Sequence, residues 1–262
     1  MKMLEDVIAI AKEAGEIIRD GYRKNFTVEF KTNSSNLVTE IDKKSEQTII
    51  SFIKEKYPTH GIIAEESGAI NINKNAEYVW VIDPLDGTTN FAHGLPIFSV
   101  SVGLQKNGET ICGIVYDVMR DMAYTAEKGA GSYCNSRKLK VSENSNLSYS
   151  LLVTGFPYDV QENPGKVMNY FAAFLHDARA IRRLGSAAID FCYVADGIFD
   201  GFWEMSLYPW DICAGRLVLE EAGGIVTDFE GIKRDIFHKQ ILATNGKVHD
   251  KMVQILKEAG SR

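Results

Sequence analysis

Residues 80–90 carry two aspartates whose type and spacing suit metal-ion chemistry. An apolar run ends at Asp83, Pro84 stops the strand, and Asp86 follows across a turn. Two carboxylates held at one point repel each other unless a cation lies between them, and oxygen ligands suit Mg²⁺. Gly87 and Thr88 then begin a helical turn whose N–H groups can bind an anion. A divalent metal beside an anion-binding turn is the arrangement that phosphoryl chemistry requires.

Further carboxylates lie at the ends of other predicted elements. Glu65 and Glu66 end a short apolar strand, Asp211 lies in the first turn of a helix, and Asp42 follows the predicted N-cap Thr39. Taken singly, each has an ordinary explanation: a solvated strand end, a helix dipole, a capping box, or an Asx turn for the Asp-x-x-Asp-Gly pattern. Because all are acidic, together they predict one site that binds metal ions.

These segments resemble the motifs of the inositol monophosphatase family. The resemblance rests on Glu65-Glu66, on Asp83-Pro-Leu-Asp86-Gly-Thr-Thr-Asn90 and on Trp210-Asp211-x-x-Ala-Gly215, and it extends through nearly the whole chain. The family consists of Mg²⁺-dependent, lithium-sensitive phosphatases. The resemblance therefore implies a mixed α/β fold, a layered αβαβα sandwich of the inositol monophosphatase and fructose-1,6-bisphosphatase type, and a homodimer.

The resemblance also implies a set of metal ligands and catalytic groups, with two to three Mg²⁺ ions. Glu65, Asp83 and the Leu85 carbonyl would hold the first ion, and Asp83, Asp86 and Asp211 the second. Glu65 would also help to hold a third ion. Thr88 and Asp42 would orient the attacking water.

Substrate contacts are implied in the same way. The backbone N–H groups of Gly87 and Thr88 would bind the phosphate, and Lys31 would lie in a loop that closes over the metals. The hydroxyl groups of the substrate would contact Gly185, Ser186, Ala187 and Glu204.

The elements that must position these residues divide the chain into two parts. Residues 1–140 contain two predicted helices (4–21 and 40–57) and a β-rich stretch with strands at 79–82, 98–104, 111–116 and 122–126. Residues 141–262 alternate between strands (151–155, 198–204) and helices (167–176, 186–196, 211–222 and from 248). The polar segment 135–150 is the predicted boundary, and the polar loop 31–36 is predicted to be mobile.

Composition excludes several classes of protein. The 262 residues are 45% hydrophobic, and 29 Lys+Arg against 35 Asp+Glu give a net charge of −6. Nucleic-acid binding is therefore not expected, since it calls for a basic face. The longest uncharged run, residues 87–105, is too polar to span a membrane, and the N-terminus is acidic too early for a signal peptide. Four dispersed cysteines suggest free thiols rather than a zinc site, so we expect a cytoplasmic protein.

The function expected first is hydrolysis of inositol 1-phosphate to inositol and phosphate by metal-activated water. Other small phosphorylated polyols or sugars remain open within the superfamily: fructose 1,6-bisphosphate, histidinol phosphate and an adenosine 3′,5′-bisphosphate. A regulatory protein that binds RNA or a transcription complex is an alternative of another class. The complete carboxylate set favours catalysis over it, and the net charge of −6 disfavours affinity for a phosphate backbone.

Overall fold

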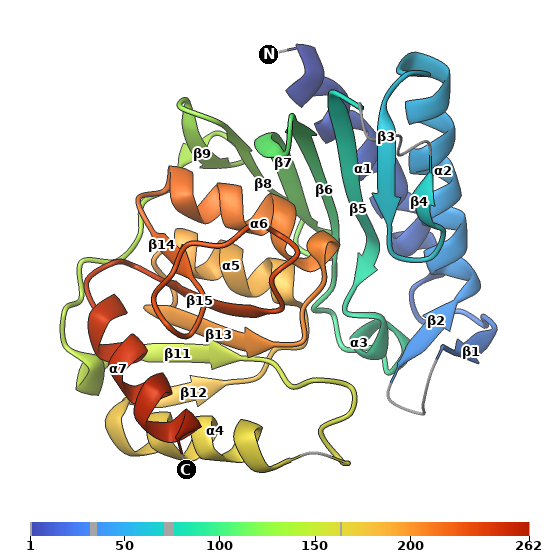
Figure 1. Cartoon of the computed structure of the whole chain (residues 1–262). Coiled ribbons are helices and arrows are strands. Elements are labelled where there is room, and N and C mark those ends of the chain that lie inside the picture. Colours follow the sequence, from blue (N-terminus) through green and yellow to red (C-terminus); the bar gives the residue numbers. More distant parts are fainter. Residues whose placement is uncertain (1, 32–35, 71–75, 163, 262) are drawn as a thin grey trace.

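The chain folds into alternating layers of helices and sheets (Figure 1). The structure is a computed structural model that describes residues 2–31, 36–70, 76–162 and 164–261. Helices α1 (Lys2–Gly21) and α2 (Glu40–Lys56) cover one face of an eight-stranded sheet. Helices α5 (Ala187–Ala195) and α6 (Pro209–Glu221) separate this sheet from a five-stranded one. Helices α4 (Gly165–Asp177) and α7 (His249–Gly260) cover its outer face, which confirms the predicted αβαβα sandwich.

The eight-stranded sheet is an antiparallel meander with one parallel pair. Its spatial order is β10-β9-β8-β7-β6-β5-β3-β4. The pair that matters for the site is β3 (Gly61–Ala64) and β5 (Tyr78–Asp86), which run parallel and so end at the same edge. The other strands are β4 (Gly68–Ile70), β6 (Ser99–Lys106), β7 (Glu109–Asp117), β8 (Met122–Glu127), β9 (Gly131–Cys134) and β10 (Arg137–Lys138).

The five-stranded sheet has the order β12-β11-β13-β15-β14. Its strands are β11 (Leu151–Thr154), β12 (Ala180–Arg182), β13 (Gly201–Met205), β14 (Ile225–Thr227) and β15 (Gln240–Thr244). Strand β11 pairs in parallel with both β12 and β13, whereas β15 is antiparallel to both of its neighbours. A separate ribbon of β1 (Val28–Phe30) and β2 (Leu37–Thr39) precedes α2.

Hydrophobic side chains between the layers form three cores. Ile18, Ile49 and Trp80 belong to the core between the outer helices and the eight-stranded sheet. Tyr124 and Phe191 belong to the core that joins the two sheets through α5 and α6. The third core lies under α4 and α7 and includes Phe174, Trp203 and Met252. Because the middle core draws on both halves of the chain, the two sheets are held in one packed body.

The predicted helices and the long strands are present with shifts at their ends. The expectation that Pro84 stops the strand is wrong: β5 continues to Asp86 through a change of register in its pairing with β6, which accommodates the proline. Strand β13 begins at Gly201 rather than at residue 198, because the N–H groups of Ile198 and Phe199 both donate to the Tyr193 carbonyl and close α5. Asn107 and Gly108 form the hairpin turn between β6 and β7, and both residues have positive φ, as a tight hairpin requires. Residues 32–35 of the predicted mobile loop lie outside the described residues.

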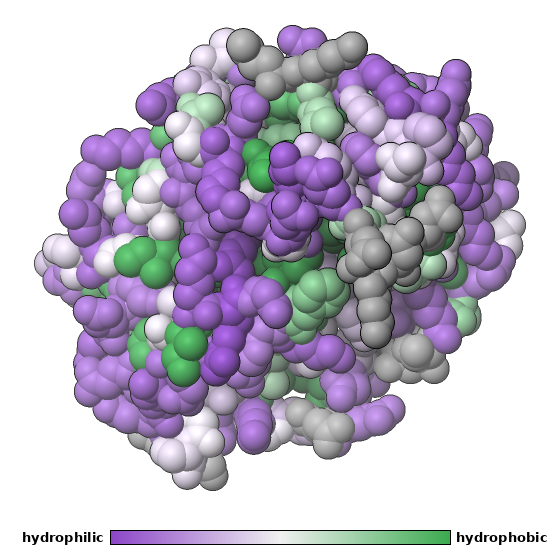
Figure 2. Space-filling view, turned by 45° about the horizontal axis from the view of Figure 1, so that its top comes forward, coloured by the Kyte–Doolittle hydropathy of each residue, from purple (hydrophilic) through white to green (hydrophobic). Residues whose placement is uncertain are grey.

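Most of the large hydrophobic side chains of the described residues are buried. On the face drawn in Figure 2, hydrophobic side chains form small patches separated by hydrophilic ones. Among the helices that the structure describes, none has the length and apolar character needed to cross a membrane.

Candidate active site

The parallel pairing of β3 and β5 brings two of the predicted ligands together. Ala64 lies opposite Ile82, so Glu65 and Asp83 leave the sheet at the same edge. The Glu65 N–H donates to the Ile82 carbonyl at 3.2 Å. The pairing of β5 with β6 changes register between Asp83 and Asp86, and the Leu85 N–H donates to Asp83 Oδ1 at 3.0 Å. The backbone of this turn therefore fixes the orientation of Asp83.

Helices α5 and α6 complete the acidic cluster from the other side of the sheet. Asp86 Oδ2 accepts hydrogen bonds from Ser186 Oγ at 2.6 Å and from the Ala188 N–H at 2.8 Å. Asp211 lies in the first turn of α6, where its Oδ2 accepts the Tyr208 N–H at 2.7 Å. The predicted capping role of Asp211 is thus present together with its place in the cluster.

The four carboxylates Glu65, Asp83, Asp86 and Asp211 lie close enough to influence one another's ionisation. Burial, then the charges of Glu65, Asp86 and Asp211, raise the pKa of Asp83 well above its ordinary value. Burial and the charges of Asp86 and Glu65 do the same to the pKa of Asp211. Burial raises the pKa of Asp86 to about 6, against the hydrogen bonds from Ser186 and Ala188, which lower it.

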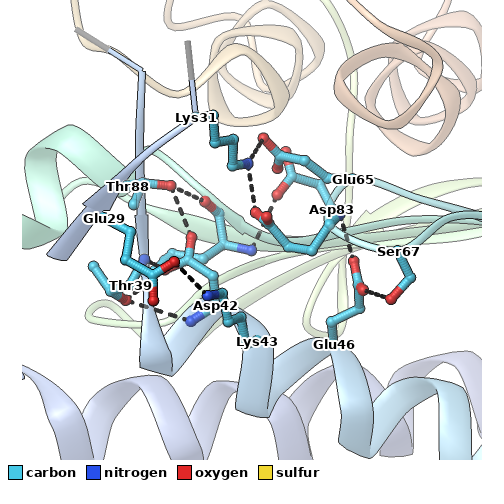
Figure 3. Close-up of polar contacts among 12 residues, drawn as sticks. Glu29, Lys31, Thr39, Asp42, Lys43, Glu46, Glu65, Ser67, Asp83 and Thr88 are labelled. Carbon is cyan, nitrogen blue, oxygen red and sulfur yellow. Dashed lines mark hydrogen bonds and ion pairs between the residues drawn. The ribbon is translucent and has the colours of Figure 1, made fainter. Parts of the chain in front are cut away.

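Mutual repulsion and oxygen donors make this cluster chemically suited to a hard divalent cation. Carboxylates that repel each other in a low-dielectric cleft are stabilised by bound positive charge. Within the described ranges, no three His, Cys, Asp or Glu side chains already stand in a ligating arrangement. In this structure Glu65 is paired with Lys31, whose Nζ donates to Glu65 Oε1 at 2.8 Å and to Glu66 Oε1 at 2.5 Å (Figure 3).

The surroundings of this bridge change the pKa of Lys31 and of Glu66. Burial lowers the pKa of Lys31, but the charges and hydrogen bonds of Glu65 and Glu66 outweigh it, so the pKa is raised. Burial and the charge of Glu65 raise the pKa of Glu66 to about 7, although Lys31 acts in the opposite direction. Lys31 therefore remains a cation next to the acidic cluster.

Asp42 and Thr88 form a buried hydrogen-bonded pair beside the cluster (Figure 3). Thr88 Oγ1 lies 2.9 Å from Asp42 Oδ1 and 3.0 Å from the Leu85 carbonyl, so both are acceptors for its hydroxyl. Asp42 Oδ2 accepts from the Thr39 N–H at 2.9 Å and from Thr39 Oγ1, which completes the capping box of α2. Burial raises the pKa of Asp42 to about 6, although the hydrogen bonds from Thr39 and Thr88 lower it.

The turn at Gly87 requires glycine. Its φ of 97° is in the left-handed region, and an added Cβ would lie 3.0 Å from the Ile97 carbonyl oxygen. Short helix α3 (Thr88–Ala92) begins immediately after this turn, as the sequence predicts. A side chain at position 87 would therefore disturb the turn that brings the backbone of Gly87 and Thr88 to the cluster.

A cavity of about 560 Å³ opens over the cluster, and most predicted site residues line it. These are Lys31, Glu65, Asp86, Gly87, Thr88, Gly185, Ser186, Ala187, Glu204 and Asp211. Three predicted residues do not line the cavity but interact with residues that do. Asp42 and the Leu85 carbonyl accept from the Thr88 hydroxyl, and Asp83 interacts with Glu65. The structure thus brings all the predicted site residues to one place.

Sequence reasoning missed several residues of the cavity wall, among them Tyr158, Asp190 and Lys239. The charges of Glu65, Asp211, Asp86 and Asp83 add to burial in raising the pKa of Tyr158, so its phenol faces the acidic cluster. Asp190 follows Ser186 by one helical turn, a spacing that could have placed it on the same helix face. Tyr158 and Lys239 lie in connecting segments and carry no comparable pattern.

Comparison with known proteins gives the same assignment along the whole chain. The model of the inositol monophosphatase family matches residues 2–261. The Nus factor SuhB of Pasteurella multocida is 44% identical over 87% of this chain and 86% of its own length. The chloroplastic phosphatase IMPL1 of Arabidopsis thaliana is 39% identical over 98% of this chain and 70% of its own.

A solved structure extends the likeness to three dimensions. The inositol monophosphatase from Anabaena superposes with a TM-score of 0.88 and 41% identity, covering 98% of this chain and 96% of that one. Motifs, architecture and site geometry therefore agree with the comparisons. This chain belongs to the inositol monophosphatase family.

Proposed function

We propose that this protein is a Mg²⁺-dependent phosphoric monoester hydrolase whose first substrate is inositol 1-phosphate. The observation that carries the proposal is the convergence of Glu65, Asp83, Asp86 and Asp211 at one end of a cavity. The Asp42–Thr88 pair lies beside them. Such an acidic cleft suits the binding of cations and of a phosphate they neutralise.

The metal ligands of this proposal follow the family pattern. Glu65, Asp83 and the Leu85 carbonyl would hold one Mg²⁺, Asp83, Asp86 and Asp211 a second, and Glu65 would contribute to a third. When bound, the ions would supply Lewis acidity to the phosphoryl group and lower the pKa of water. The raised pKa values of Asp83 and Asp211 support this role, since cations are what stabilise their ionised forms.

Thr88 and Asp42 would orient the water that attacks phosphorus. Because the Thr88 hydroxyl donates its hydrogen within the protein, the lone pairs of its oxygen can accept a hydrogen bond from water. Asp42, with a pKa of about 6, is mostly ionised at pH 7 and keeps Thr88 in this orientation. The N–H groups of Gly87 and Thr88, at the start of α3, would bind the phosphate oxygens.

The residues Gly185, Ser186, Ala187 and Glu204 would contact the substrate's hydroxyl groups. Glu204 lies close against Gly155, where any side chain would overlap its carboxylate. The Ser186 hydroxyl donates to Asp86, so its side chain orients a carboxylate and its backbone remains for the substrate. Because water is the attacking group in this proposal, no side chain of the protein would act as the nucleophile.

The test is phosphate release from a panel of substrates with Mg²⁺ and with a chelator. The panel contains inositol 1-phosphate, fructose 1,6-bisphosphate, histidinol phosphate, adenosine 3′,5′-bisphosphate and an aryl phosphate. We expect Mg²⁺-dependent release, fastest from inositol 1-phosphate. Release that persists in the chelator would contradict the metal-dependent mechanism, and preference for another substrate would reassign the substrate.

Lithium sensitivity is part of the same proposal. A small monovalent cation can compete for the oxygen ligands Asp83, Asp86 and Asp211 without matching the charge of Mg²⁺. Millimolar LiCl should therefore slow turnover at saturating substrate, whereas the same concentration of NaCl should not. Complete indifference to LiCl would contradict this part of the proposal.

A second candidate function is association with a transcription complex, because one relative that is 44% identical is named Nus factor SuhB. Such a role is compatible with catalysis, since it would use other surfaces. The test is affinity capture with and without nuclease. Recovery of transcription proteins that resists nuclease would support direct binding, and their absence would contradict it.

We also propose that the protein is a cytoplasmic homodimer. All four cysteines are buried free thiols, which is typical of proteins in a reducing compartment. Sedimentation equilibrium of the purified chain tests the oligomeric state, and a monomer mass of 29.2 kDa would contradict the dimer.

A further inference from the structure

One carboxylate in the cavity wall has no part in the mechanism above. Asp190 lies in the first turn of α5, is 1% exposed and lines the cavity. Its Oδ1 is buried and has no hydrogen-bond partner within the described residues. The α5 dipole accounts for a negative charge at this position but not for the missing donor. A buried acceptor without a donor is costly, so the observation points to a donor that comes from a ligand.

Asp190 shares its part of the cavity with two other charged residues, Glu204 and Arg183. Burial raises the pKa of Asp190 well above its ordinary value. The charge of Glu204 raises it too and that of Arg183 lowers it, so the three groups interact electrostatically. The Arg183 guanidinium lies 6.0 Å from the centre of the Phe156 ring, which fixes it at the cavity wall. This part of the cavity therefore presents two acceptor groups, Asp190 and Glu204, together with one cation, Arg183.

Two glycines make room for these charged groups. A Cβ at Gly155 would overlap the Glu204 carboxylate, and a Cβ at Gly185 would overlap Arg183 Nη1. Gly185 also has a φ of 90°, which few other residues adopt. The backbone is therefore shaped to hold the side chains of Glu204 and Arg183 against the cavity.

We propose that Asp190 is a specificity-determining residue that forms, with Glu204, a pair of acceptors for two hydroxyl groups of the substrate. The proposal rests on the proposed phosphatase function and narrows its substrate class to monophosphates of uncharged polyols. A hydroxyl group supplies the donor that Asp190 lacks. An ionised second phosphate at the same place has no hydrogen to donate and would leave Asp190 Oδ1 without a partner.

The test compares Asp190→Asn with the wild type on inositol 1-phosphate and on p-nitrophenyl phosphate, both with Mg²⁺. The amide keeps the shape of the side chain but removes its charge and one acceptor. We expect KM for inositol 1-phosphate to rise about tenfold with kcat nearly unchanged, because one hydrogen bond to a buried carboxyl group is lost on binding. KM for the aryl phosphate, which has no hydroxyl groups to offer, should stay within about twofold.

The matched control is Asp117→Asn, which also removes a fully buried aspartate charge. Asp117 is paired with Arg120 at 2.8 Å and does not line the cavity. Thermal unfolding reports whether each variant is folded, and Asp190→Ser replaces Asp190→Asn if the amide is not tolerated. The control should change the unfolding temperature without separating the two substrates.

Equal changes of KM on both substrates, or none on either, would overturn the role of Asp190. Wild-type hydrolysis of the aryl phosphate without hydrolysis of inositol 1-phosphate would overturn it as well. If the wild type hydrolysed neither compound, the proposed function would fail. Calorimetric binding of inositol 1-phosphate to the wild type and to Asp190→Asn would then test the role of Asp190 in binding without reference to activity. Binding by the variant that is about tenfold weaker would support that role, and equal binding would overturn it.

Discussion

Asp83 is the residue on which the proposed metal site depends most. It is 2% exposed, and the charges of Glu65, Asp86 and Asp211 all add to the effect of burial on its pKa. In the proposal it is also the one carboxylate shared by two ions. Its removal should therefore affect every step that needs bound Mg²⁺.

We expect Asp83→Asn to lower kcat by roughly three orders of magnitude or more, since metal-ion stabilisation of a transition state is worth several kcal/mol. The fold should survive, because the amide has the same shape and relieves repulsion within the cluster. Phosphate release and calorimetric Mg²⁺ binding check the effect, and both should fall together.

Asp200→Asn is the matched control for Asp83→Asn. Asp200 is buried too, but it accepts the Leu151 N–H at 3.0 Å and the Ser142 hydroxyl, outside the cavity. Its variant should unfold at a lower temperature and still bind Mg²⁺. Near-normal turnover of Asp83→Asn in saturating Mg²⁺ would show that Asp83 does not bridge the ions.

At the scale of the element, the start of α2 links stability to catalysis. Thr39 caps this helix, and both its N–H and its hydroxyl donate to Asp42, the residue that holds Thr88. The N-terminal cap of one helix therefore sets the ionisation of a proposed catalytic group. A change in the cap should be visible in both properties.

Thr39→Ala should lower the free energy of unfolding by about 1 kcal/mol, the usual contribution of an N-cap. It should also raise the pKa of Asp42 above about 6, because the hydroxyl hydrogen bond favours the ionised form. The acidic limb of the kcat profile should then move to higher pH. Thr48→Ala is the control: Thr48 lies later in the same helix, is half-buried and donates its hydroxyl to the Lys44 carbonyl, so its loss should change neither property. An unshifted profile with a normal loss of stability would restrict Thr39 to capping.

Elements differ in how far the sequence predicts them. Helices α1 and α2 have long apolar periodicity, and α2 also begins at a capping box. These are local signals, so the ends of both helices are predicted within a few residues. Strands β10 and β12 have two and three residues and exist only because distant strands pair with them. No local pattern can indicate them, and the same holds for β14, which pairs with β15.

The same distinction applies to the candidate site. Its carboxylates could be predicted because Asp83 and Asp86 share one motif and Glu65 ends the strand that pairs with it. Tyr158 could not, since its place in the cavity depends on how the second sheet packs against the first. For Asp190 the only local signal is its spacing of one helical turn from Ser186. The proposed metal-binding carboxylates therefore lie in short motifs that the sequence reveals. The shape of the cavity wall around the substrate depends on the whole fold.

The whole molecule holds its acidic cleft where two packed sheets meet, so the stability of the protein should depend on pH and Mg²⁺ together. Burial raises the pKa of Glu66 to about 7 and that of Glu204 to about 8. Burial and the neighbouring carboxylates also raise the pKa of Asp83 well above its ordinary value. Above pH 5 the native state therefore binds more protons at these groups than the unfolded chain does, whose carboxyl pKa values are near 4.

A state that binds more protons loses stability as the pH rises. Burial lowers the pKa of His60 and His249, which acts in the opposite direction, but their effect is complete once unfolded histidine has titrated near pH 6.5. Between pH 6.5 and 8.5 the unfolding temperature of the metal-free protein should therefore fall, by about 3 °C or more for each pKa unit that is titrated. At pH 8.5 few protons compete for the carboxylates, so saturating Mg²⁺ should restore most of the lost unfolding temperature. At pH 6.5 protons do compete, so Mg²⁺ should raise the unfolding temperature less. Scanning calorimetry at both pH values, with and without Mg²⁺, measures the four unfolding temperatures. A metal-free protein whose unfolding temperature rises toward pH 8.5 would show that the cleft carboxylates are already ionised without a cation.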